Sequence, residues 1–487
     1  MPQRQKMGRA RLRITAGLLG VAAVVVGGFA APAGAATVPA QNNMIIAGGS
    51  NTTYAMMSQL SELFNASPGC DLAVPSGTQN LDYRCPNPQN STGGENGLGD
   101  GKGYTNTGSI AQGDPENPYN DVVVQEPALG SSNGIKELDQ RGTNNAPLNF
   151  ARSSRGPNNG LPAPVGAPVT TTNTDPEGLN FVAYAADAVP WFHFTKVGGV
   201  ATPSSGITSL SLSQLAAVYN GTVTKWSDLC PSSPKKTAKK CNSAAGNASI
   251  VVYTAQNGSG TEGTWQSELG LTTNGNANLF NGVPNDGKHV IFENEISGIL
   301  ANGDEANAIF FFSYGKFQTD CTTGLTKGTT AGCGGAQAPS GSQMGLGEET
   351  ISGTGSPITA SQATILDGSF PTDRYLYNVY SNGTNSSFPA ATQPTLNFMS
   401  EWGFICKQDS AIDSNSGVSY GSEIQSIIKS NGFFPLSSGL IDASNVDSNA
   451  HITDPGYSFV DPESQTSSPS SAQGLCRVFT TDGDGTT

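Results

Sequence analysis

Three stretches of the chain share one local order: a short apolar run, a turn rich in Gly, Ser and Thr, and an amphipathic segment. They are MIIAGGSNTTYAMMSQLSELF at 44–64, DVVVQEPALGSSNGIKELDQ at 121–140 and ASIVVYTAQNGSGTEGTWQSELG at 248–270. After each turn, apolar residues recur at helical spacing, which predicts strand, turn and helix in that order. Such units build open α/β sheets, in which ligands collect at the carboxyl ends of the strands. The pattern therefore predicts an α/β fold.

The third turn contains NGSGTEG at 257–263, which is suited to holding an oxyanion. The N–H groups in the first turn of a helix have no partner inside the helix and carry a partial positive charge. Gly260 lets a ligand approach the backbone, and Ser259 and Thr261 add hydroxyl donors. Taken alone, the stretch is more typical of an ordinary turn with a helix N-cap. Both interpretations stay open at this point.

The first 36 residues have the features of a secretory signal. Five basic residues and no acid precede an apolar run over 14–31, and small residues follow, with a cleavage site expected near Ala35 or Ala36. Glycines interrupt the apolar run, so a permanent membrane anchor is less favoured. No cysteine stands at the cleavage site to accept a lipid. We expect a secreted chain with no membrane span, released or held at the cell surface by other contacts.

The charge of the chain excludes some partners. The full sequence has 24 basic and 38 acidic residues, a net charge of −14, and removal of the five basic residues of the leader leaves 19 against 38, a net of −19. Nucleic acids and anionic membranes are poor partners for such a surface. An anion site here has to depend on local donors.

Eight cysteines follow the leader, and their even number and spacing in an exported chain predict disulfides. Pairing of neighbours is the simplest connectivity: Cys70 with Cys85, Cys230 with Cys241, Cys321 with Cys333, and Cys406 with Cys476. Zinc is the competing explanation, but no C-x-x-C occurs and the three histidines stand apart in sequence. We expect no metal and no cofactor.

Length and composition predict more than one lobe. About 450 mature residues exceed what one core usually covers. Two tracts rich in Gly and Asn, 87–108 and 324–345, lack the periodicity of a core and are predicted to be surface insertions. The first also allows a calcium loop, but the full spacing of calcium ligands is missing.

One further stretch carries a family resemblance. ITSLSLSQLAAVYNGTVTKWSDL at 207–229 resembles a helix and turn pattern of the phosphate-binding component of bacterial phosphate ABC importers, a type II periplasmic-binding-protein-like superfamily. The matching positions are Leu215, Val218, Tyr219, Gly221, Val223, Lys225, Trp226 and Asp228. NAIFFFSYGKF at 307–317 and FPTDRYLYNVYS at 370–381 resemble the late strand and the return crossover of that family.

The resemblance implies a two-lobed α/β fold, with mixed sheets flanked by helices and the ligand cleft between the lobes. We expect lobe 1 at 44–177 and 373–487 and lobe 2 at 178–372. The implied function is binding of an oxyanion, most simply inorganic phosphate, for uptake through an ABC permease, by a monomer without enzymatic activity.

The resemblance also assigns ligand residues. The first turn supplies Thr53 and Tyr54, the second supplies Ser131, and the third supplies Ser259, Gly260 and Thr261. With three turns in register, an oxyanion site is favoured over three ordinary turns.

The chain departs from the family at both charged ligand positions. Ser154 stands where the family has an aspartate, and Ala255 stands where it has an arginine. Arg152, two residues before Ser154, either replaces the missing cation or, like Arg155, forms an ion pair. Glu262 either replaces the missing acid or, as the position favours, is a first-turn carboxylate that points to solvent. Because charge-assisted hydrogen bonds are the stronger contacts, the selectivity among anions should differ from that of the family.

Two other functions compete with solute uptake. An esterase-like enzyme needs Gly-x-Ser-x-Gly and a histidine with an acid partner, and neither is recognisable around Ser259, His193 or His289. The second is a secreted binding-fold protein that has lost import and acts as a scavenger, sensor or adhesion component, with a different anion or none. The missing lipid anchor, the insertions and the two lost charges favour this alternative.

Overall fold

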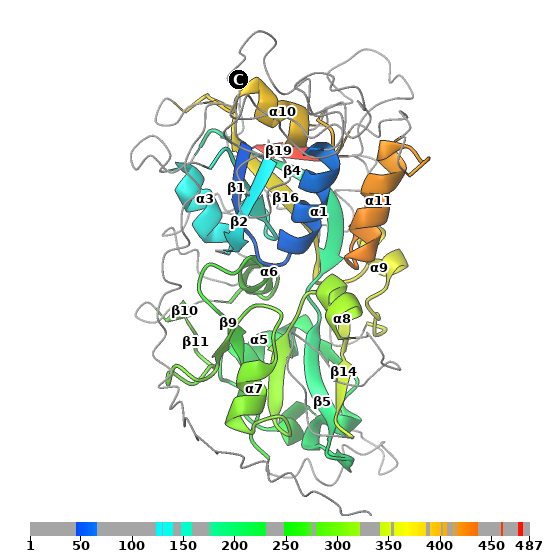
Figure 1. Cartoon of the computed structure of the whole chain (residues 1–487). Helices are drawn as coiled ribbons and strands as arrows, with labels where there is room; N and C mark the ends of the chain where they lie inside the picture. The colour runs from blue at the N-terminus through cyan, green and yellow to red at the C-terminus, as the bar shows by residue number, and fades with distance from the viewer. Residues whose placement is uncertain are drawn as a thin grey trace, which may run out of the picture. The chain divides into compact units, whose positions relative to one another are not determined.

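The structure is a computed structural model, and it describes the chain in segments (Figure 1). These are 45–65, 123–128, 130–139, 148–157, 175, 177–229, 248–271, 273–274, 279–321, 341–351, 355–385, 390–400, 403–406, 413, 416–436, 459–460 and 476–480. Several predicted features lie outside these residues: the signal peptide, the 87–108 insertion, and Cys70, Cys85, Cys230, Cys241 and Cys333. Among the described residues, no helix combines the length and apolar character that crossing a membrane requires.

The first sheet has eight strands and mixed direction. Its order is β18 (Phe459–Val460), β19 (Arg477–Thr480), β4 (Leu179–Ala188), β16 (Asp373–Ser381), β3 (Phe150–Ser153), β1 (Ile45–Gly49) and β2 (Val123–Ala128), with β17 (Phe434–Pro435) paired to β4. Strand β1 runs parallel to β2 and β3, whereas β16 runs antiparallel to both β3 and β4.

Helices cover both faces of this sheet. Alternate residues of β16 enter different cores: Leu376 packs in the core with α1 (Tyr54–Asn65) and α11 (Tyr420–Ser430), and Tyr377 packs in the core with α3 (Ser131–Asp139) and α9 (Gln362–Leu366). Helix α10 (Gln393–Met399) joins the first of these cores through Phe398 and Met399. We call these elements and the first sheet the first lobe.

The second sheet follows the same construction. Its order is β14 (Gln343–Leu346), β5 (Trp191–Val197), β13 (Ala308–Phe311) and β8 (Val251–Val252), with β6 (Val200–Ala201) paired to β5. One face packs on α5 (Leu212–Tyr219) and α6 (Gly260–Glu268), the other on α7 (Ser297–Asn302) and α8 (Tyr314–Asp320). We call these elements the second lobe. As expected for a core tryptophan, Trp265 of α6 is fully buried and stacks on Phe311 with ring centroids 5.2 Å apart.

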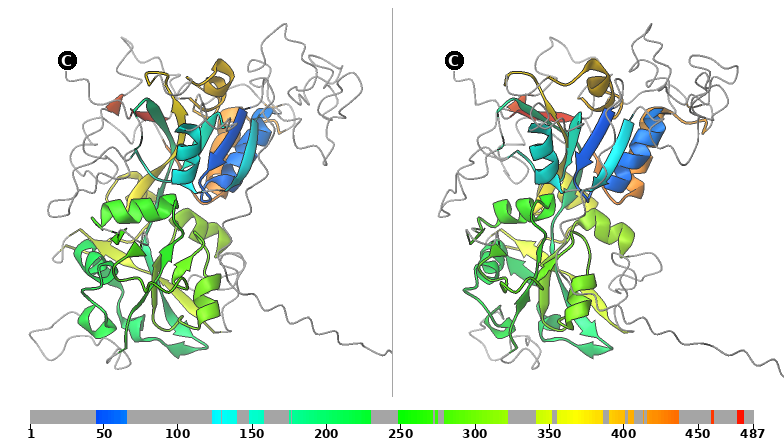
Figure 2. Two further views of the ribbon diagram at one scale, coloured as in Figure 1. Left: turned by 90° about the vertical axis from the view of Figure 1, so that its left-hand side faces the viewer. Right: turned by 60° about the vertical axis from the view of Figure 1, so that its left-hand side comes forward.

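Short elements complete the second lobe (Figure 2). Strand pairs form between β7 (Ser209–Ser211) and β15 (Glu348–Thr350), β9 (Thr254–Ala255) and β12 (Val290–Ile291), and β10 (Thr273–Asn274) and β11 (Leu279–Phe280). Two 3₁₀ turns lie at Pro203–Gly206 and Trp226–Leu229.

Two neighbouring strands connect the sheets. Strand β4 ends at Ala188, opposite Asp373 at the start of β16. Just beyond this pair, the N–H of Val189 donates to the carbonyl of Thr372 at 2.8 Å, and the Thr372 hydroxyl donates to the carbonyl of Val189 at 3.0 Å. The segment by which the chain leaves the first lobe is thus bonded to the segment that leads from α9 into β16.

The prediction of an α/β fold with mixed sheets flanked by helices is confirmed, as are all three strand–turn–helix units. The lobe boundary predicted at 178 remains a proposal, and because β4 pairs in the first sheet we now place it after Ala188. The predicted 324–345 insertion extends too far, because its last residues, from Gln343, lie in β14 and pair with β5.

One predicted disulfide is fully described. Cys406 is bonded to Cys476, as neighbour pairing predicted, and the bond joins the turn after α10 to β19. Cys321, at the end of α8, is also disulfide-bonded, and its predicted partner lies outside the described residues.

Candidate functional site

The second and third turns meet directly. The N–H of Ser132 donates to the carbonyl of Gly258 at 3.1 Å. The Ser131 hydroxyl, at the first residue of α3, accepts from the N–H of Ser154 at 2.9 Å and lies 3.3 Å from its hydroxyl. A Cβ on Gly260, the first residue of α6, would collide with both hydroxyls. Only glycine at this position lets α6 approach the two serines so closely.

The N-terminus of α6 shows the two predicted roles in Ser259 and Thr261, on either side of Gly260. Ser259 is the N-cap, because its hydroxyl accepts from the N–H of Glu262 at 3.1 Å. Thr261, in contrast, presents both its N–H and its hydroxyl to the carboxylate of Glu293. The ordinary turn therefore describes the Ser259 side chain, and the donor role describes Thr261.

A carboxylate occupies the position at which an external anion was expected. Oε1 of Glu293 accepts from the N–H of Thr261 at 3.0 Å, from the Thr261 hydroxyl, and from the hydroxyl of Thr52 at 2.9 Å. Glu293 is 3% exposed, and its Oε2 has no hydrogen-bond partner among the described residues. Thr52 belongs to the first lobe and Thr261 to the second, so Glu293 joins the lobes.

The segment that carries Glu293 is held in place on both sides. The N–H of Glu293 donates to the side-chain oxygen of Gln256 at 2.6 Å. Asn294 follows with a φ of 63°, a left-handed conformation that asparagine tolerates better than most residues. Its amide nitrogen donates to the Thr52 hydroxyl at 3.1 Å, and its amide oxygen accepts from the N–H of Ser313 at 2.8 Å.

A cation reaches the site from β16. Arg374 is 4% exposed, and its Nη1 donates to the Thr261 hydroxyl at 3.0 Å and to the Ser154 carbonyl at 2.9 Å. Its Nε and Nη2 donate to Oδ2 of Asp187 at 3.1 and 2.7 Å. Asp187, on β4, also accepts from the Ser313 hydroxyl and from the N–H of Gly315 in the first turn of α8. Sequence reasoning missed this pair, although the crossover stretch that contains Arg374 had been recognised.

Arg152 has different surroundings from those that either interpretation predicted. It is fully buried on β3, and its Nη1 donates to Oε1 of Gln125 at 2.6 Å and to the carbonyl of Ala47 at 3.2 Å. Its guanidinium also lies 5.1 Å from the centroid of the Tyr54 ring. These contacts hold Arg152 within the first lobe. Arg155 does form an ion pair, with Nη1 and Nη2 each 2.8 Å from a carboxylate oxygen of Asp175, but both residues are buried, so this is not the predicted surface pair.

In the turn before α1, Thr52 is the residue that contacts Thr261 and Glu293. The family resemblance had instead assigned Thr53 and Tyr54 to the site. Thr53 is fully buried and lies beside Tyr184: burial raises the pKa of Tyr184, and the Thr53 hydroxyl opposes that rise. Tyr54 is 37% exposed and packs on the guanidinium of Arg152. A TT dipeptide at the start of a helix offers two hydroxyls, and sequence alone did not tell which faces Thr261.

Glu262 does not point to solvent, so that prediction is wrong. It is 8% exposed, and its Oε1 accepts from the hydroxyl of Thr254 on β9 at 3.1 Å. Burial raises the pKa of Glu262 to about 8, an effect that the Thr254 hydrogen bond opposes and the nearby Glu293 charge increases. The side chain turns inward because α6 packs its first turn against β9.

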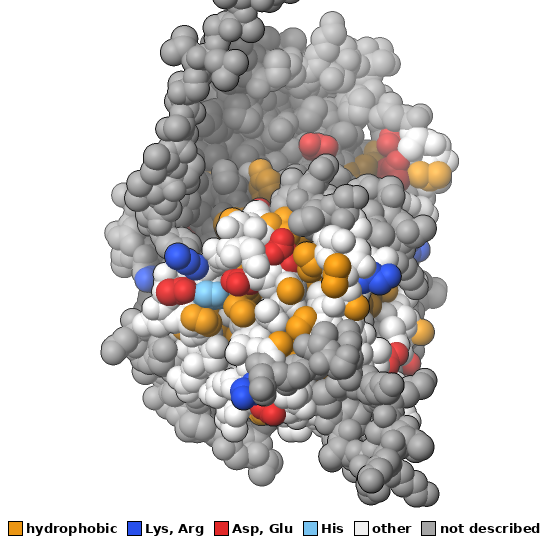
Figure 3. Space-filling view, turned by 90° about the horizontal axis from the view of Figure 1, so that it is seen from below, with side chains coloured by type: hydrophobic (Ala, Val, Ile, Leu, Met, Phe, Trp, Pro, Cys, Tyr) orange, Lys and Arg blue, Asp and Glu red, His pale blue; other side chains and the backbone are white. Residues whose placement is uncertain are grey.

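The histidines do not join the hydroxyl cluster. His193 Nδ1 lies 2.7 Å from the Ser204 hydroxyl, and burial lowers the pKa of His193 to about 3, so the ring stays neutral. His289 is bonded to Asp286 at 2.8 Å and lies 3.3 Å from Asp304, acid partners that were not recognised in the sequence. In the view from below, a histidine lies beside acidic side chains among scattered hydrophobic ones (Figure 3). That the protein is no enzyme stays a prediction.

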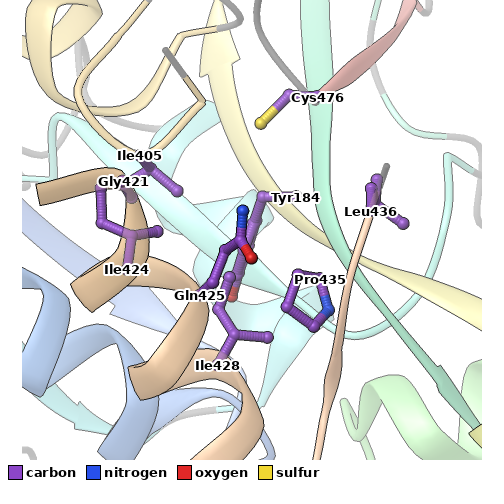
Figure 4. A pocket seen from close by; sticks show the side chains of 9 residues that line it. All are labelled: Tyr184, Ile405, Gly421, Ile424, Gln425, Ile428, Pro435, Leu436 and Cys476. Carbon is purple, nitrogen blue, oxygen red and sulfur yellow. The ribbon is translucent and has the colours of Figure 1, made fainter. Parts of the chain in front are cut away.

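A small pocket in the first lobe is a poor alternative site. It lies between α11, β17 and β4, and nine residues line it (Figure 4): Tyr184, Ile405, Gly421, Ile424, Gln425, Ile428, Pro435, Leu436 and Cys476. Its interior of about 10 Å³ corresponds to a single water molecule. The donor cluster around Thr261 is therefore the candidate site.

Comparison with known proteins finds a family-model match for the central part of the chain. Residues 182–398 match the model of a PBP superfamily domain. The chain is similar to the crystal structure of an ABC-type phosphate transport receptor from Vibrio cholerae, with 15% identity, a TM-score of 0.41, and coverage of 80% of this chain and 99% of that one. It is also similar to a phosphate-binding protein from Stenotrophomonas maltophilia, with 13% identity, a TM-score of 0.37, and coverage of 83% and 94%. No match is found among curated proteins.

Proposed function

We propose that the chain, whose residues 182–398 match the model of a PBP superfamily domain, is a solute-binding protein that holds a small oxyanion at the N-terminus of α6. Inorganic phosphate is the first candidate. One observation carries the proposal: donors from separate segments converge beside Thr261, namely the Thr52 hydroxyl, the Thr261 N–H and the Arg374 guanidinium.

Two features would attract an oxyanion to this point: the N-terminus of α6 and the guanidinium of Arg374. The α6 N-terminus is the positive end of the helix dipole, and its Thr261 N–H donates to a carboxylate, the kind of acceptor that an oxyanion also offers. Arg374 adds a charge-assisted donor, which is the stronger kind of hydrogen bond. The hydroxyls of Ser131 and Ser154 border the same point and donate without requiring a particular protonation state of the ligand. Sulfate is therefore a reasonable second ligand.

We further propose that the protein is exported and serves phosphate uptake together with an ABC permease. The basic and apolar leader supports export. The Cys406–Cys476 disulfide agrees with an oxidising compartment.

Isothermal titration calorimetry of the purified mature protein with phosphate and with sulfate tests the proposal. We expect binding of at least one anion and a loss of affinity of about tenfold or more in Thr261→Val, because a buried hydroxyl donor is removed. Thr222→Val, on an exposed turn of the second lobe, is the matched control and should bind like the wild type. If neither anion gives heat at millimolar concentration, the oxyanion function is refuted.

A second candidate is favoured by a specific observation. Because Glu293 already satisfies Thr52 and Thr261, the chain also fits a secreted binding-fold protein without an anion ligand, acting as a scavenger, sensor or adhesion component. Such a protein would show no heat with either anion. Fractionation of the producing cells adds a second criterion, because uptake requires retention at the cell surface, whereas a free role places the protein in the medium.

A further inference from the structure

We propose that Glu293 is an internal anion that determines which solutes the site accepts. Its carboxylate accepts hydrogen bonds from the Thr261 N–H and from the Thr52 and Thr261 hydroxyls, and we call this set of donors the seat. A solute binds in the seat by displacing the carboxylate. The inference rests on the proposed function, because it concerns the same seat.

The contacts of Glu293 are those of a bound anion. A single oxygen, Oε1, accepts a main-chain N–H at 3.0 Å and two hydroxyls, one from each lobe. This is the arrangement expected of an external oxyanion at a helix N-terminus. The second oxygen, Oε2, is buried without a partner among the described residues. A buried carboxylate oxygen without a donor is costly, so the surrounding donors satisfy the Glu293 carboxylate only in part.

The local charges oppose the entry of a further anion while Glu293 stays. Arg374 is already paired with Asp187 at 2.7 Å, so this pair has no net charge. Glu293 then leaves one negative charge on the seat, and an incoming anion at hydrogen-bond distance would meet a like charge in a buried environment. Departure of Glu293 removes this repulsion and frees the Thr261 N–H.

The segment around Glu293 offers a route for departure. Phe292, the residue before it, is 48% exposed, and β12 ends at Ile291. The side chain of Glu295, two residues further, is part-exposed and accepts only a long 3.3 Å bond from the Ser297 hydroxyl among the contacts described. Phe292 and Glu295, which flank the buried Glu293 and Asn294, therefore border solvent.

If a solute has to displace Glu293 in order to bind, the site should select among anions. A side chain tethered next to its seat competes at a high effective concentration. A free carboxylate has the same chemistry as Glu293 and gains nothing in exchange for it. A tetrahedral oxyanion carries more charge and more acceptor oxygens, and it can engage Thr261, Arg374 and the two serines together. The site should accept phosphate and reject acetate and formate.

Glu293→Gln tests the inference, because it keeps the size of the side chain and removes its charge. We expect phosphate affinity to rise by about tenfold, the difference between a charged and a neutral competitor for the same donors. Glu295→Gln, in the same segment, is the matched control and should leave the affinity unchanged. In the absence of ligand, hydrogen exchange of the 259–262 segment should be faster in Glu293→Gln only, because the acceptor of the Thr261 N–H is weakened.

The outcomes separate the two proposals. Unchanged or weaker phosphate binding in Glu293→Gln overturns the inference and leaves the oxyanion function standing, and so does tight acetate binding by the wild type. If neither protein binds phosphate, the oxyanion function fails. In that case faster exchange confined to Glu293→Gln still supports Glu293 as the internal ligand of α6, and unchanged exchange overturns that as well.

Discussion

Replacement of Arg374 by methionine should destabilise the protein strongly. The guanidinium donates four hydrogen bonds at 2.7 to 3.1 Å, two of them to the carboxylate of Asp187. Methionine preserves much of the apolar volume but leaves Asp187 as a fully buried charge, with only the donors at the start of α8. Removal of one partner of a buried ion pair typically costs about 3–5 kcal/mol, and we expect the free energy of unfolding to fall by that amount.

A double-mutant cycle separates the ion pair from the other effects of the substitution. In Asp187→Asn the amide oxygen still accepts from the start of α8, and no charge is left for Arg374 to neutralise. In the double variant neither charge remains, so its loss of stability should be smaller than the sum of the single losses by about 2 kcal/mol. Urea unfolding, followed by tryptophan fluorescence, measures all three.

Lys316→Met is the control for loss of a basic residue. Lys316 and Asp320 form a part-exposed ion pair one turn apart at 3.0 Å, for which we expect a cost of at most about 0.5 kcal/mol. Strict additivity of Arg374→Met and Asp187→Asn would refute the coupling, and a loss below about 1 kcal/mol in Arg374→Met would refute the buried-pair argument.

Three further predictions concern other parts of the chain. Burial raises the pKa of Glu349 from 4.5 to about 8, so the unfolded chain releases a proton that the folded protein keeps. The free energy of unfolding should therefore fall as pH rises between these values, by up to about 1.4 kcal/mol per pH unit, and urea unfolding of Glu349→Gln between about pH 5 and pH 8 should show a smaller slope. Replacement of Cys406 and Cys476 by alanine opens a loop with a sequence separation of 70 and should cost about 4 kcal/mol in the same assay; a loss below about 1 kcal/mol would contradict the chain-entropy account. Gly260→Ala drives a methyl group into two serine hydroxyls and should weaken phosphate binding in calorimetry. Gly263→Ala in the same helix meets only the flexible Arg155 side chain at 3.0 Å, and equal effects of the two would contradict the close-approach argument.

The sequence predicted the fold well because its signals were local. The apolar periodicity after each turn predicted α1, α3 and α6, and the buried residues of α1 include Met56, Met57, Leu60 and Phe64, which are spaced for one face of a helix. Cys406 and Cys476 paired as neighbours in the cysteine order, although 70 positions separate them. The lobe boundary was harder to predict from the sequence, because β4 is recognised as part of the first sheet only through its pairing with β16.

The site was predicted in part, and what was missed depends on tertiary contacts. Ser131, Ser154, Gly260 and Thr261 do lie together. Arg374 was missed because a cation on a distant strand carries no local motif. Its contacts link residues more than 100 positions apart in the chain. Glu293 was missed for the same reason, since FENEISG contains no recognised pattern and its role appears only when the loop folds back on α6.

Two paired segments, rather than one flexible linker, carry the chain between the sheets. The reciprocal bonds between Val189 and Thr372 tie these segments side by side. A double connection of this kind resists sliding and twisting of one lobe against the other, so relative motion is restricted to a bending hinge at this point. Any bending at this point has to break the contacts that span the lobes, including those of Thr52 and Arg374.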